Sequence, residues 1–382
     1  MIEKVEISKE QIISFALDYL RFPLALIVIL VHVLNIDDVG VDVSGCNVGM
    51  IEHGSIFDSV RYIINVFIRG ISVPIYLFIS GYVFFRGLNE YTLKTYKNKI
   101  SNRIHSLLIP YFIWNSIELL LVIFIHLSSL KSYTAGCGTL NLSLRNIISC
   151  FWVYNGHLVD SGVVAVQSNA LFPLNTPLWF LRDLFCVALI TPIIYIILKK
   201  LGHWAIIILF GLCVLPIANA PLLDQFFSVL LFFSIGAYLA IHKVDLIKLF
   251  TRFYILSIFI YVVGSVISIV VENAIISNIF KNISILGALF LLYNLALKKV
   301  QSNGYRKTAF LAASSMFLYL SHSLICMRFY KVLLLIFNPN HNVEIVFCLL
   351  ISYILVIAVL LISYYILRKY TPRIAAILTG RK

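Results

Sequence analysis

The chain has 382 residues, of which 61% are hydrophobic and 12% charged, and its formal net charge is +13. A soluble globular domain carries about 25% charged residues and could not bury so large an apolar fraction. The apolar residues fall in blocks of about 20, the length that an α-helix needs to cross a bilayer. The sequence therefore predicts an all-α integral membrane protein. Its excess of positive charge is expected beside the membrane, and no nucleic acid is expected as a partner.

Ten apolar blocks, taken in chain order, predict about ten transmembrane helices. They cover about 12–36, 62–85, 104–130, 177–198, 202–217, 225–241, 253–271, 279–297, 308–334 and 343–367. The loops on the side of both termini hold most of the Lys and Arg residues outside the blocks. Because cytoplasmic loops carry such an excess, both termini are expected in the cytoplasm. We expect one polytopic domain over 1–382, with a short cytoplasmic N-terminus (1–11) and a C-terminal tail (about 369–382).

Two long outer loops are expected at 37–61 and 131–176. Long ordered loops often carry function, so these two could cap an outward-facing cavity; the alternative is that they are solvated connections. Seven cysteines are present without a Cys-x-x-Cys spacing. Neither a zinc site nor a disulfide framework is indicated, and no metal is expected.

The first apolar block carries three ionisable residues, Asp18, Arg21 and His32. At about 100° per residue, their offsets of 3 and 11 place all three within roughly 60° of one another on the helix surface. Taken singly, His32 could be a core imidazole, and Asp18 with Arg21 an ion pair that anchors the helix. An aligned stripe of charge inside a membrane is costly and more often marks a functional site. Since an imidazole titrates near neutral pH, His32 is a candidate general base.

The second block contains Arg69 and then the run Ser80-Gly81-Tyr82. Small residues let another helix or a ligand approach the backbone closely, so helix packing and ligand binding are equal alternatives for Ser80 and Gly81. In the third block Glu118 is a lone carboxylate that requires a basic partner. Arg69 is one of several candidates for that partner.

The fourth block opens with Trp179 at the depth of the membrane interface, followed by Arg182 and Asp183. Adjacent helical residues point about 100° apart, so Arg182 and Asp183 are not expected to neutralise each other. The ninth block carries Tyr319 and a second intramembrane histidine, His322.

Four short motifs carry a resemblance to a known family. They are Asp18-Tyr19-Leu20-Arg21 with His32, the run Val73–Tyr82 that ends in Ser-Gly-Tyr, Leu178-Trp179-Phe180-Leu181, and Phe317-Leu318-Tyr319-Leu320-Ser321-His322. In this order the motifs resemble the acyltransferase-3 group, bacterial membrane enzymes that O-acylate extracytoplasmic glycans and similar acceptors. The resemblance runs over most of the chain and implies a multi-pass protein of the bacterial cytoplasmic membrane.

One motif departs from the family pattern. Many relatives carry Arg-x-x-Arg before a Leu-Leu-x-Pro-Tyr run, but here Ser106 stands where the second Arg is expected, three residues after Arg103. If these arginines hold the phosphates of acyl-coenzyme A, then Lys99 or His105 must supply the missing charge. The alternative for this basic segment is the ordinary excess of positive charge on the cytoplasmic side.

The resemblance implies transfer of an acyl group, most often acetyl, from cytoplasmic acyl-CoA to a hydroxyl of a surface polysaccharide or its lipid-linked precursor. No tightly bound cofactor is expected. The expected catalytic residues are His32 and Arg21: His32 would remove the hydroxyl proton, and Arg21 would guide the pantetheine arm or the diphosphate. The acyl group either rests on His32 or moves directly to the acceptor. The expected substrate-binding residues are Arg69, Ser80, Tyr82, Trp179, Arg182, Tyr319 and His322, and the expected coenzyme-binding residues are Lys99, Arg103 and His105.

Two other functions fit the same sequence features. A transporter or flippase for a polar or lipid-linked substrate also places a few charges inside a helical bundle, although the inverted repeats common in transporters are not found. A membrane acyltransferase could instead act on a protein or a lipid. The sequence leaves the oligomeric state open, a homo-oligomer included.

Overall fold

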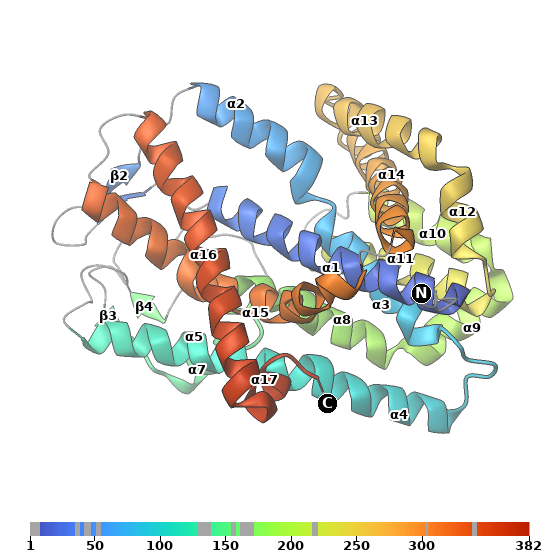
Figure 1. Ribbon diagram of the computed structural model, residues 1–382, viewed down its shortest axis with the longest axis horizontal. Coiled ribbons are helices and arrows are strands. Elements are labelled where there is room, and N and C mark those ends of the chain that lie inside the picture. Colours follow the sequence, from blue (N-terminus) through green and yellow to red (C-terminus); the bar gives the residue numbers. More distant parts are fainter. Residues whose placement is uncertain are drawn as a thin grey trace, which may run out of the picture. The chain divides into compact units, whose positions relative to one another are not determined.

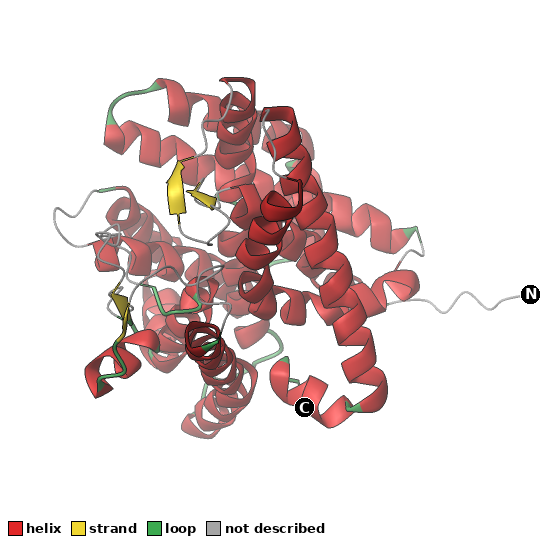
Figure 2. Ribbon diagram, turned by 90° about the vertical axis from the view of Figure 1, so that its left-hand side faces the viewer, coloured by secondary structure: helices red, strands yellow, loops and turns green. Residues whose placement is uncertain are grey.

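The computed structural model describes residues 8–34, 39–41, 47–50, 55–128, 139–153, 158–160, 172–215, 221–302, 305–337 and 342–381. Within these residues the regular structure is helical apart from two small antiparallel strand pairs, drawn in yellow in Figure 2. One pair joins β1 (Val39–Val41) to β2 (Asn47–Met50), and the other joins β3 (Thr139–Leu140) to β4 (Val159–Asp160). Both pairs fall in the predicted outer loops, whose remaining parts are largely outside the described residues.

The helices occur in the following order (Figure 1). They are α1 (Lys9–Leu34), α2 (Ser55–Ile64), the π-helical turn η1 (Asn65–Arg69), α3 (Ser72–Phe85), α4 (Leu93–Arg103), the π-helical turn η2 (Ile104–Leu108), α5 (Ile109–Leu127), α7 (Leu144–Cys150), the 3₁₀ turn η3 (Thr176–Leu178), α8 (Trp179–Leu189), α9 (Thr191–Leu201), α10 (His203–Val214), α11 (Pro221–Ile241), α12 (Leu246–Arg252), α13 (Tyr254–Val270), α14 (Ala274–Gln301), α15 (Tyr305–Phe337), α16 (Asn342–Tyr370) and α17 (Pro372–Leu378).

Each of the ten predicted blocks overlaps a helix or a bent pair of helices. Among the described residues, six helices are long and apolar enough to cross a membrane, or up to eight spans exist if each bent pair is one span. The blocks at 202–217 and 253–271 correspond to the shorter apolar helices α10 and α13. The structure thus confirms a helical, multi-pass membrane protein. The number of ten spans and the cytoplasmic termini stay predictions.

The two bent pairs have local causes. Between α8 and α9 the axis turns by 65°, and Pro192 lies in the first turn of α9. Pro192 has no N–H to bond the Ala188 carbonyl, which accepts a hydrogen bond from the Thr191 hydroxyl instead, at 2.6 Å. The 120° turn between α11 and α12 passes through Lys243 at φ 51°, and Asp245 caps α12 by accepting a hydrogen bond from the Lys248 amide.

The chain forms two compact units. The first comprises Met1–Ile27, Asn65–Ile100 and Cys186–Ser315, and the second comprises Val28–Ile64, Ser101–Phe185 and Met316–Lys382. In the first unit α3 packs along α11, and α13 packs along α14. In the second unit α17 packs against α5 and α16, so the predicted C-terminal tail is in part a docked helix.

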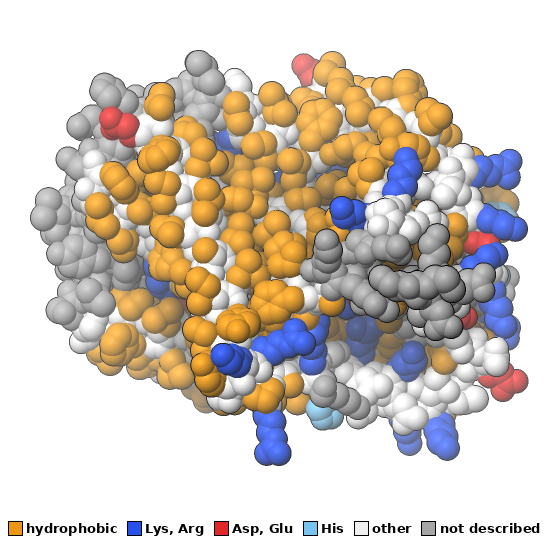
Figure 3. Space-filling view, viewed as in Figure 1, with side chains coloured by type: hydrophobic (Ala, Val, Ile, Leu, Met, Phe, Trp, Pro, Cys, Tyr) orange, Lys and Arg blue, Asp and Glu red, His pale blue; other side chains and the backbone are white. Residues whose placement is uncertain are grey.

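Large apolar side chains also cover the outer surface. On α16 the side chains of Val343, Phe347, Ile354 and Ile362 are exposed, and hydrophobic side chains cover the region of α16 in Figure 3. Exposed apolar surface on this scale is unfavourable in water and matches the acyl chains of a bilayer. The outer face of α16 therefore fits contact with lipid.

Candidate active site

Two intramembrane histidines lie side by side in the second unit. The ring centroids of His32 on α1 and His322 on α15 are 5.0 Å apart, with the ring planes tilted by 50°. His322 is fully buried, whereas His32 is half-buried. The sequence singled out both residues, and the structure places them in contact.

The hydrogen bonds of His322 determine which nitrogen carries its proton. Nδ1 lies 2.8 Å from the Tyr319 carbonyl oxygen and 3.2 Å from that of Leu318. A carbonyl only accepts, so Nδ1–H is the donor and Nε2 of the neutral ring keeps its lone pair. Nε2 is buried and has no hydrogen-bond partner within the part of the chain that the structure describes. His322 therefore presents an unused proton acceptor beside His32.

Tyr319 connects the histidine pair to the segment before α8. Its hydroxyl donates to the Pro177 carbonyl, and its ring lies 5.7 Å from that of Phe180 and 6.1 Å from that of His322. Trp179 follows in the first turn of α8, with its ring 6.0 Å from that of Phe172. Tyr319 thus holds the beginning of α8 against the helix that carries His322.

Arg182 and Asp183 form an ion pair, which corrects the expectation that adjacent helical residues would not neutralise each other. Arg182 Nε lies 2.8 Å from Asp183 Oδ1, and both side chains are buried. The Arg182 guanidinium also donates to the Trp152 carbonyl and lies 5.2 Å from the centre of the Trp152 ring. The helical angle applies to Cβ directions, but the long arginine side chain folds back to the buried carboxylate. The substrate-binding role of Arg182 stays a prediction.

Four other predicted site residues lie on α1, η1 and α3 in the first unit. Arg21 forms an ion pair with Asp18 at 2.9 Å, the alternative that the sequence offered for these two residues, and its carbonyl accepts a hydrogen bond from the Tyr76 hydroxyl. Arg69 is exposed at the end of η1. Ser80 and Tyr82 are buried on α3. Their roles toward substrate stay predictions.

The basic segment at the boundary before the third block contains the predicted coenzyme-binding residues. Lys99 lies on α4 with its ammonium group 5.7 Å from the centre of the Phe84 ring. His105 is exposed, with Nδ1 2.8 Å from the Ser101 carbonyl oxygen, and Arg103 precedes it by two residues.

Ser106, the residue that departs from the family pattern, is in contact with the C-terminal segment. Gly380 has φ +65°, and a Cβ on it would lie 2.4 Å from the Ser106 carbonyl oxygen and 2.6 Å from its Cα. Trp114 fixes the same segment by donating from Nε1 to the Leu378 carbonyl at 2.9 Å. Arg381 follows Gly380 directly and is exposed.

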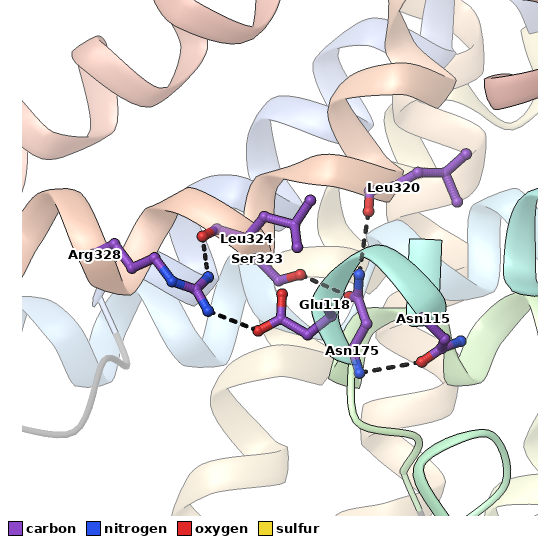
Figure 4. A network of polar contacts seen from close by, with 7 residues as sticks. All are labelled: Asn115, Glu118, Asn175, Leu320, Ser323, Leu324 and Arg328. Atoms are coloured by element: carbon purple, nitrogen blue, oxygen red, sulfur yellow. Dashed lines mark hydrogen bonds and ion pairs between the residues drawn. The ribbon is translucent and has the colours of Figure 1, made fainter. Parts of the chain in front are cut away.

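A buried polar network, which the sequence did not identify as a unit, completes the second unit (Figure 4). Arg328 Nη2 lies 2.9 Å from Glu118 Oε1, so the partner of Glu118 is Arg328. Asn175 donates its backbone N–H to Asn115 Oδ1 and accepts at its own Oδ1 from the Ser323 hydroxyl, at 3.2 and 2.6 Å. The sequence signal that could have indicated this network is the spacing of three residues between Asn115 and Glu118 on one helix.

The chain thus folds as a multi-pass helical membrane protein with a pair of contacting imidazoles as its candidate catalytic centre. Comparison with known proteins identifies the family: the model of the acyltransferase domain of the acyltransferase-3 family matches residues 14–368, and the chain belongs to this family. It is also similar to the succinoglycan biosynthesis protein ExoH of Rhizobium meliloti (strain 1021), with 27% identity over 201 residues. That match covers 51% of this chain and 47% of the relative, about half of each. No solved structure matches the chain.

Proposed function

We propose that the protein is an O-acyltransferase that moves an acyl group, acetyl in the simplest case, from cytoplasmic acyl-CoA to a hydroxyl of an extracytoplasmic saccharide. The saccharide would be a surface polysaccharide or its lipid-linked precursor. Membership of the acyltransferase family and the similarity to a succinoglycan biosynthesis protein support this proposal. The observation that carries it is the contact between His32 and His322, with the unused lone pair on His322 Nε2.

The proposed reaction needs one base and a place for one proton. The acceptor oxygen attacks the thioester carbonyl carbon while its proton passes to His32, and the tetrahedral intermediate then breaks its carbon–sulfur bond. The CoA thiolate leaves and takes the proton back from His32, so that free CoA and the acyl ester are the products. A neutral His322 supports this cycle because its Nε2 can accept a hydrogen bond from the protonated ring of His32.

The donor's phosphates are proposed to bind at the basic segment where α4 ends and η2 begins. Arg103 supplies one guanidinium, and Arg381 supplies the charge that Ser106 lacks. Since Gly380 packs on Ser106, the Cα of Arg381 lies within about 8 Å of the Ser106 Cα, within reach of a shared phosphate. Arginine binds phosphate by charge-assisted, often bidentate, hydrogen bonds. As a separate proposal, carried over from the sequence, Arg21 on α1 guides the pantetheine arm.

The test is to follow the label from [¹⁴C]acetyl-CoA in membranes that contain the protein and de-acylated succinoglycan oligosaccharide as acceptor probe. The proposal predicts that the label becomes covalently attached to the saccharide and that alkaline hydrolysis releases it as acetate. His322→Gln, which removes the imidazole at similar size, should reduce the labelling strongly at equal protein amount.

Two outcomes would contradict the proposal. Movement of the unmodified oligosaccharide across the membrane without acetylation would identify a transporter or flippase. Label found only on lipid or protein would identify an acyltransferase with a different acceptor.

A further inference from the structure

Glu118 is held on one side only, in contrast to the other side chains of the network around it. Its Oε1 is paired with Arg328, while its Oε2 is buried and has no hydrogen-bond partner among the described residues. In Figure 4 the second oxygen of Glu118 accordingly carries no dashed line. The side chain is 12% exposed. A carboxylate oxygen that is unsatisfied in an apolar span is costly, so Oε2 favours a hydrogen bond from a ligand.

The network around Glu118 fixes its position. Asn175 bonds to Asn115, three residues before Glu118 on α5, and to the Leu320 carbonyl and the Ser323 hydroxyl on α15. Arg328 donates to the Leu324 carbonyl as well as to Glu118. Because α5 and α15 are tied at several points, the unsatisfied oxygen has a defined place relative to α15, the helix that carries His322.

The chemistry of a ligand that would suit Oε2 follows from charge. Arg328 already neutralises Glu118, so the pair as a whole calls for no further cation. A carboxylate oxygen only accepts hydrogen bonds, so the ligand must donate one. In the proposed acyl transfer, the neutral hydrogen-bond donor that enters the site is a hydroxyl of the saccharide acceptor.

The position along α15 also fits an acceptor. Arg328 follows His322 by six residues, a rise of about 9 Å along the helix. This separation suits a saccharide of one or two rings. In the expected orientation α15 runs from the cytoplasm outward, so Glu118 and Arg328 lie on the outer side of His322, from which an extracytoplasmic acceptor enters.

We propose that Glu118 Oε2 accepts a hydrogen bond from a saccharide hydroxyl, and that Glu118 with Arg328 forms an acceptor subsite on the outer side of the histidine pair. This inference rests on the proposed acyl transfer. It assigns Glu118 to acceptor binding and leaves the donor to other residues.

The experiment compares the wild type with Glu118→Gln, purified in nanodiscs, using acetyl-CoA and de-acylated succinoglycan oligosaccharide. Gln keeps an acceptor for Arg328 but places an amide donor where Oε2 stood. The KM for the oligosaccharide should rise at least tenfold, as expected for loss of a hydrogen bond to a charged group, while the KM for acetyl-CoA stays within twofold. Glu344→Gln, at an exposed position of α16, is the matched control and should change neither constant.

A second variant and a binding assay make the outcome decisive. Glu118→Asp keeps the charge and withdraws the oxygen by one methylene, so it should show the same acceptor-specific defect if Glu118→Gln does not fold. Direct titration of the oligosaccharide should show weaker binding to both variants even without turnover.

An unchanged KM for the oligosaccharide with weaker thermal stability would mean that Oε2 holds only structural water, and it would overturn the proposal. Equal increases of the KM for the oligosaccharide and the KM for acetyl-CoA would also overturn the proposal. Absence of any acetyl transfer by the wild type, with saccharide binding that still depends on Glu118, would count against the proposed function and not against the subsite.

Discussion

Gly81 on α3 and Gly236 on α11 mark a place where two helix backbones touch. A Cβ on Gly81 would lie 2.0 Å from the Phe233 carbonyl oxygen, and a Cβ on Gly236 would lie 2.1 Å from that of Phe78. The sequence left packing and ligand binding as alternatives for Gly81. The structure assigns it to packing, because no side chain fits between these two helices.

Adding one methyl group at this contact should destabilise the first unit. Gly81→Ala and Gly236→Ala each force the helices apart, and such overpacking costs about 1–3 kcal/mol or more. Thermal unfolding of the detergent-solubilised protein should show a lower midpoint for both variants. Gly211→Ala on α10 is the control, since a Cβ there meets nothing within 4 Å. Midpoints equal to that of this control would show that the two helices do not pack as described.

Tyr319→Phe should weaken the attachment of the segment before α8 to α15. The variant loses the hydroxyl that bonds the buried Pro177 carbonyl, and an unsatisfied buried group costs about 1–3 kcal/mol. We expect a lower unfolding midpoint together with slower acyl transfer. Tyr370→Phe, at an exposed position of α16, should leave both unchanged. Wild-type stability in the Tyr319 variant would argue against this link.

Arg381→Ala should raise the KM for acyl-CoA several-fold and leave the KM for the saccharide unchanged. The loss reflects one guanidinium removed from a phosphate site that already lacks an arginine at Ser106. Arg373→Ala, at an exposed position of α17, removes the same charge from the C-terminal segment eight residues before Arg381 and is the matched control. Equal effects of the two variants would reduce the role of Arg381 to general positive charge.

Cys150 should resist alkylation in the folded protein. It is fully buried at the end of α7, and burial raises the pKa of its thiol to about 11. At pH 7.5 only about 0.03% of such a thiol is thiolate, the reactive form. Peptide mapping after iodoacetamide treatment should find Cys150 unmodified in detergent and modified after denaturation. Rapid modification in the native state would show that α7 opens or packs differently.

The positions of the helices could be predicted from sequence because apolar length and charge placement follow directly from the bilayer. The contacts between residues far apart in the sequence could not be predicted in this way. Glu118 and Arg328 are 210 residues apart, and His32 and His322 are 290 apart, so neither pair has a local signal. The prediction for Arg182 and Asp183 was wrong although the two residues are neighbours in the sequence, because an ideal helical angle ignores the reach of a long side chain. The hydrogen bond from His322 Nδ1, which frees Nε2, depends on side-chain orientation and is accessible only from coordinates.

The measurement that tests the account most directly is the initial rate of acetyl transfer from acetyl-CoA to the oligosaccharide by His32→Ala in nanodiscs. A positioned general base contributes about a hundredfold to ten-thousandfold in rate. We therefore predict a loss of at least a hundredfold at equal amounts of folded protein, with acetyl-CoA binding retained. A rate within a few-fold of the wild type would contradict the assignment of His32 as the base and, with it, the role given to the histidine pair.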